Sequence, residues 1–236
     1  MPPLDDNAVR SLGMALVAAL GAAAVGPLVM RALPFERKVA LGGMGAVASG
    51  VMLGAAYLIM ATSMESWPGI TPLAAVITVP IIFAAHRAIR RRPPVHATRQ
   101  MALLHGIPEG IALGTALAAR FPLGFWLGLT IALHNLAEGA LFDARTREAG
   151  AMQGLARGAW LALIDKLPQA FAALGAWLLV EAMPVATAPL FASAFAGLVY
   201  LVVAELLMEA YERIGRVGVA LTVMAAGAVV AALGGG

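Results

Sequence analysis

The sequence predicts an all-α integral membrane protein in which eight transmembrane helices form one domain over residues 1–236. Hydrophobic residues make up 61% of the chain and charged residues 12%, and the mean hydropathy is +0.87. A soluble domain of this size needs a polar shell that such a composition does not supply. In addition, the chain divides into apolar stretches that are each long enough to cross a bilayer.

Each expected span contains roughly 20 mainly apolar residues, the length that a membrane helix needs. The N-terminal segment lacks the basic residues that begin a cleaved signal peptide, so we interpret the first span as retained. The expected spans are 11–30, 39–61, 70–88, 101–119, 123–142, 158–180, 186–208 and 217–233.

The distribution of basic residues predicts the orientation of the chain. Thirteen of the sixteen Lys and Arg residues fall in the connections after the first, third, fifth and seventh spans, and two fall on the opposite side. The positive-inside rule therefore places these connections in the cytoplasm and both termini outside, in a multi-pass protein of the inner (cytoplasmic) membrane. This rule also explains the net charge of +3 without a nucleic-acid partner. Membrane lipid is the expected surrounding, and assembly as a homodimer is left open.

Two nearly identical polar motifs interrupt the fourth and fifth expected spans. They are His105-Gly-Ile-Pro-Glu109-Gly and His134-Asn-Leu-Ala-Glu138-Gly. In a helix, positions i and i+4 lie on one face, so each histidine lies over its glutamate. Two such helices packed face to face would present two imidazoles and two carboxylates to one point. Ionisable residues inside a membrane are costly, and their presence indicates a functional site.

The residue types in these motifs favour a divalent metal ion. Imidazole nitrogen and carboxylate oxygen together suit Zn²⁺, Fe²⁺, Mn²⁺ or Cd²⁺, and the chain has no cysteine to supply a thiolate. Two carboxylates neutralise one divalent ion, which offsets the cost of burying either charge alone. Asn135 could add an amide oxygen or orient a ligand. Pro108 removes one helical hydrogen bond and predicts a kink beside the site. No organic cofactor is expected.

These motifs, on the fourth and fifth of eight spans, resemble those of the ZIP (Zrt/Irt-like) divalent metal transporters, as in a divergent member of the bacterial GufA-like branch. Gly50-Val-Met-Leu-Gly54 is similar to a Gly-Val-Met-Leu segment of that branch. The resemblance implies a 3+2+3 arrangement of spans with inverted pseudosymmetry. It also implies inward transport and a metal site formed by His105, Glu109, His134 and Glu138, with Met52 nearby.

The sixth span departs from the family pattern. Where the family has Glu-Pro, this chain has Leu167-Pro168, preceded by Asp165 and Lys166. One carboxylate of a two-metal centre is therefore absent. We hypothesise that the protein binds one metal ion and that the Lys166 ammonium lies near the two carboxylates, where it supplies the charge of a second ion. Asp165 is interpreted as an internal charge partner, with direct ligation as the alternative.

Three further residues are placed toward the cytoplasmic side. Glu205, about one turn from the end of the seventh span, is either a relay for metal release or a solvated helix end. His86 and His96 are interpreted as interfacial loop residues.

The leading functional hypothesis is transport of a divalent metal ion across the cytoplasmic membrane, by a protein that is not an enzyme. Its histidine and glutamate ligands must lose protons to bind the metal, which makes proton coupling plausible. One alternative is an intramembrane metal-dependent hydrolase, although the sequence contains no His-Glu-x-x-His motif. Another is a transport-inactive relative that senses metal.

Overall fold

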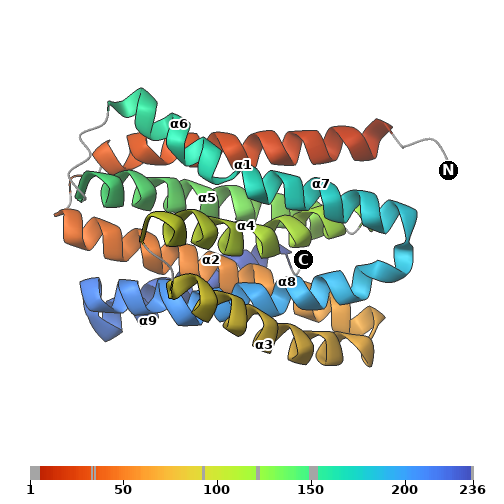
Figure 1. The fold of residues 1–236 in the computed structure, drawn as a ribbon. Helices are drawn as coiled ribbons and strands as arrows, with labels where there is room; N and C mark the ends of the chain where they lie inside the picture. The colour runs from red at the N-terminus through yellow and green to blue at the C-terminus, as the bar shows by residue number, and fades with distance from the viewer. Residues whose placement is uncertain are drawn as a thin grey trace.

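The computed structural model describes residues 6–32, 34, 36–91, 94–120, 123–148 and 154–234, and all of its regular elements are helical. The helices run lengthwise in one bundle, with α1 and α3 along opposite edges (Figure 1). The elements are α1 (Asp6–Ala32), α2 (Arg37–Ser66), α3 (Ile70–Arg90), α4 (Pro94–Ala118), α5 (Leu123–Glu148), α6 (Leu155–Asp165), α7 (Leu167–Ala182), a 3₁₀ turn (Pro184–Ala186), α8 (Thr187–Leu201), a π-helical turn (Val202–Leu206) and α9 (Leu207–Gly234).

The all-α prediction is confirmed for the part of the chain that the structure describes. Within it, six segments are long and apolar enough to cross a membrane. The fourth expected span corresponds to a shorter apolar helix, Leu103–Ala118, and the seventh and eighth fall together in one 49-residue segment, Pro184–Ala232. The other five expected spans each match one segment.

The chain reverses direction inside this last segment, at Gly215. Its φ of 72° and ψ of 175° are not helical, and a positive φ favours glycine, which has no Cβ. The residues that pack on α2 run antiparallel to it before Gly215 and parallel to it afterwards. In order along the chain, the close neighbours are Ala210 with Gly45, Ile214 with Gly42, Val223 with Gly50 and Val230 with Gly54.

The sixth expected span is divided between α6 and α7 at Lys166. Lys166 lies between the end of α6 at Asp165 and the start of α7 at Leu167, with φ −91° and ψ −1°, and Pro168 lies in the first turn of α7. Proline is tolerated there because the first amide groups of a helix have no helical partner. The break places Lys166 in the interior of the bundle. By contrast, α4 continues as one helix through Pro108.

Glycines allow several helices to approach one another closely. A Cβ added to Gly110 would collide with the carbonyl oxygen of Gln169, and one added to Gly114 with that of Ala173, so α4 lies directly against α7. Gly139 of α5 packs in the same way on the carbonyl of Ala23 in α1. Close packing of small residues is how membrane helices associate without a hydrophobic driving force between them.

We expect Gly114→Ala to destabilise the protein by about 1–3 kcal/mol or more, because the new methyl group must push α4 away from α7. Gly175→Ala is the matched control. Gly175 lies in α7 with no atom within 4 Å of an added Cβ, so alanine should be neutral or stabilising by up to about 1 kcal/mol. The measurement is unfolding in detergent, and equal midpoints for the two variants would contradict the close contact.

Candidate metal centre

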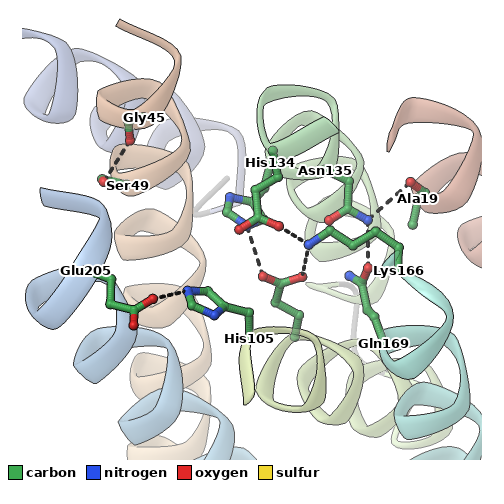
Figure 2. Close-up of polar contacts among 11 residues, drawn as sticks. Ala19, Gly45, Ser49, His105, His134, Asn135, Lys166, Gln169 and Glu205 are labelled. Atoms are coloured by element: carbon green, nitrogen blue, oxygen red, sulfur yellow. Dashed lines mark hydrogen bonds and ion pairs between the residues drawn. The ribbon is translucent and has the colours of Figure 1, made fainter. Parts of the chain in front are cut away.

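The two motifs lie on neighbouring helices and meet in the interior of the bundle. His105 and Glu109 lie one turn apart on α4, and His134 and Glu138 one turn apart on α5. Both helices lie beside the α6–α7 break, where Lys166 enters the bundle from a third direction (Figure 2).

Three of the four motif side chains converge. His134 Nε2 lies 2.9 Å from Glu109 Oε1 and 3.3 Å from Glu138 Oε1. One ligand atom from each of Glu109, His134 and Glu138 can be chosen so that all lie within 4.8 Å of one another. The side chains of Glu109 and His134 are 1% exposed and that of Glu138 is 16% exposed. The three residues form a buried group that could bind a metal ion.

The geometry of this group fits a metal ion in two ways. Ligand atoms about 2.0–2.1 Å from a Zn²⁺ ion in tetrahedral geometry lie about 3.3 Å from one another, close to the separations seen here. In addition, one imidazole nitrogen and two carboxylate oxygens are a donor set that suits a divalent ion.

Lys166 occupies the other side of the two carboxylates. Its Nζ contacts Glu138 Oε2 and lies 3.4 Å from Glu109 Oε2, and the side chain is 4% exposed (Figure 2). The ammonium that was predicted near these carboxylates therefore lies beside them. Asp165, the last residue of α6, is partly buried beside it.

His105 is the motif residue that does not join the group. Its Nε2 lies 3.1 Å from Glu205 Oε2, and Figure 2 shows the two side chains pointing toward each other. Glu205 lies within the π-helical turn Val202–Leu206. Such turns insert an extra residue into a helix and are frequent at functional sites.

The interpretation of His86 as an interfacial loop residue is wrong. His86 lies in α3, which continues to Arg90, and its side chain is 6% exposed. Its Nε2 lies 2.8 Å from Glu205 Oε1 and its Nδ1 lies 2.8 Å from the hydroxyl oxygen of Tyr200. The expected span 70–88 already contained His86, and this position was the signal that His86 belongs to a membrane helix and not to a loop. The side chain of His96 lies outside the described residues.

Asn135 takes part in a buried amide contact beside the metal group. Its Nδ2 donates hydrogen bonds to the carbonyl oxygen of Ala19 at 3.2 Å and to Gln169 Oε1 at 2.7 Å (Figure 2). The contact joins α5 to α1 and α7, and Asn135 Oδ1 accepts no hydrogen bond from the described residues. Gln169 was not predicted as part of the site, although an amide side chain inside an apolar span was an available signal.

Met52 is 2% exposed and belongs to the main apolar core, together with Leu113 and Ile131. Its position on α2 is therefore interior, and its proximity to the metal site, which the resemblance implied, stays a prediction.

Neither a scan against protein-family models nor a search of curated proteins finds a match to this chain.

Proposed function

We propose that this chain is a carrier that takes up a divalent metal ion such as Zn²⁺ across the cytoplasmic membrane, and that it is not an enzyme. The observation that supports this most directly is the group Glu109, His134 and Glu138, buried in a bundle of helices apolar enough to span a membrane. Buried carboxylates and imidazoles inside a membrane are costly and typically mark an ion pathway.

The reversal at Gly215 supports eight crossings with both termini on the same side, because it divides Pro184–Ala232 into two antiparallel legs. The basic residues in the connections after the odd-numbered spans support an outside location for both termini. The paired motifs on the fourth and fifth spans support membership of the ZIP family. We therefore extend the proposal to the 3+2+3 arrangement and to the inward direction that this family implies.

Polar side chains continue from the metal group toward the end of the bundle that carries most of the basic residues. Side-chain exposure is 1% at Glu109 and His134, 12% at His105 and 22% at Glu205. In the other direction the helices meet through fully buried apolar side chains, namely Ile59, Leu113, Leu127 and Phe191. This asymmetry supports a carrier closed on the outer side, with release through His105, Glu205 and His86.

In alternating access, groups of helices rock against each other around a central site. His105 lies on α4, and Glu205 lies in the π-helical turn between α8 and α9. A movement between these helices would therefore change the contact between the two side chains.

Uptake into proteoliposomes tests the proposal. Vesicles that contain the purified full-length chain and a trapped Zn²⁺-responsive dye should accumulate Zn²⁺ saturably, and protein-free vesicles should not. Competition by Mn²⁺, Fe²⁺ and Cd²⁺ would rank the substrates. Binding without accumulation would support a sensor, metal-dependent hydrolysis without accumulation would support an enzyme, and either result would contradict a carrier.

Glu205→Gln is expected to slow uptake at least tenfold while it changes the affinity for Zn²⁺ in detergent by less than about threefold. Glu205 lies outside the metal group but contacts both histidines of the release path. Glu209→Gln is the control, because Glu209 lies one turn further on, beside Arg213. Equal losses of binding and uptake in Glu205→Gln would instead make Glu205 a primary ligand.

A further inference from the structure

The oxygens of the two buried carboxylates are divided between two positions. Oε1 of Glu109 and Oε1 of Glu138 face His134 Nε2, at 2.9 and 3.3 Å. Oε2 of each residue faces Lys166 Nζ. The carboxylates therefore bridge two places where a positive charge is stabilised: one beside an imidazole, and one that the ammonium of this chain already occupies.

The fold fixes Lys166 in the second position. The residue lies at the junction of α6 and α7, is 3% exposed and has both carboxylates as charge partners. A buried ammonium without such partners is strongly destabilising. Moving the Lys166 side chain away from the carboxylates would therefore cost a large free energy. Lysine also carries its charge as a compact point, in contrast to the extended guanidinium of arginine.

Lys166 changes the charge that a metal ion meets. With His134 neutral, the two carboxylates and the ammonium carry one net negative charge, and a single divalent ion converts this to one net positive charge. A second divalent ion would raise the positive charge further and would have to displace Lys166 from the Oε2 atoms. Like charges held a few ångströms apart in a weakly polar interior repel strongly.

We propose, on the basis of the metal site assigned above, that Lys166 is the resident cation of a second cation position. It limits the site to one divalent ion per chain, and its repulsion lowers the affinity of that ion, which favours release.

The experiment measures Zn²⁺ stoichiometry and affinity by equilibrium dialysis of the full-length protein in detergent. The variants are Lys166→Glu and Lys166→Gln, and the control is Lys38→Gln, since Lys38 is the only other lysine of the chain. We expect one ion in the unmodified protein and in Lys38→Gln. We expect two ions in Lys166→Glu, where a carboxylate replaces the ammonium, and an affinity for the first ion at least tenfold higher in Lys166→Gln.

Two ions in the unmodified protein, or a single ion in a folded Lys166→Glu variant, would overturn the inference and leave the metal site intact. If Lys166→Glu does not fold, Lys166→Gln decides: an affinity raised threefold or more supports the inference, and a smaller change overturns it. The absence of bound Zn²⁺ from the unmodified protein would instead remove the metal site itself.

Discussion

Glu109→Gln is expected to lower the affinity for Zn²⁺ at least about a hundredfold and to abolish uptake. The substitution keeps the shape of the side chain but removes a charge whose oxygens face His134 on one side and Lys166 on the other. Loss of one partner from a buried charge group costs about 3–5 kcal/mol, which corresponds to roughly a hundredfold to several thousandfold in binding. Equilibrium dialysis and proteoliposome uptake measure the two effects.

Glu65→Gln is the control for this experiment. Glu65 lies in the last turn of α2 with an exposed side chain, and its substitution should alter neither binding nor uptake. A Glu109→Gln variant that is folded and retains uptake would exclude Glu109 from the transport site.

Asp143→Ala is expected to destabilise the protein by about 1.5–3 kcal/mol, because it removes two hydrogen bonds between a buried carboxylate and a guanidinium that is 25% exposed. Asp143 is 1% exposed and accepts two hydrogen bonds from Arg31, from Nη2 at 2.7 Å and from Nε at 3.1 Å. A Cβ added to Gly158 would lie 2.7 Å from Asp143 Oδ1, so this ion pair joins α1, α5 and α6. Unfolding in detergent measures the loss.

A second ion pair of the chain supplies the comparison. Glu209 and Arg213 pair at 3.1 Å one turn apart, but their side chains are 31% and 21% exposed. Because water screens such pairs, Glu209→Ala should cost less than about 1 kcal/mol. Replacing both partners, as in Arg31→Met with Asp143→Leu, should recover most of the loss from Asp143→Ala, because no polar group is then left without its partner. No recovery would mean that the charges themselves are required.

The sequence predicted those features that depend on neighbours along the chain. The spacing of His134 and Glu138 placed both on one face of a helix, and the structure brings them together with Glu109. Apolar length predicted most of the helices. Lys166 was expected beside the two carboxylates because it directly precedes Leu167-Pro168, the position of Glu-Pro in the family that the motifs resemble.

Features that depend on distant contacts could not be predicted in this way. Asp143 and Arg31 are 112 residues apart, and Arg31 served only as a topology signal because nothing in its local sequence indicates a partner. The contact between His86 and Glu205 likewise depends on how α3 packs on α8 and on a π-helical turn that no local pattern marked. His105 faces Glu205 instead of the metal group. The spacing of His105 and Glu109 along the chain does not decide which of the two carboxylates His105 contacts.

The π-helical turn Val202–Leu206 contains one more residue than an α-helical turn, and this extra residue sets the rotation of α9 relative to α8. Successive residues of an α-helix are rotated by about 100°, so removing one residue from the turn would rotate everything after the deletion relative to α8 by about that angle. If the surplus residue migrated past Glu205 along the helix, the carboxylate would turn away from both histidines without any change in the composition of the chain. Glu205 therefore connects His86 of α3 to His105 of α4 only while the π-helical turn keeps its present position along the helix.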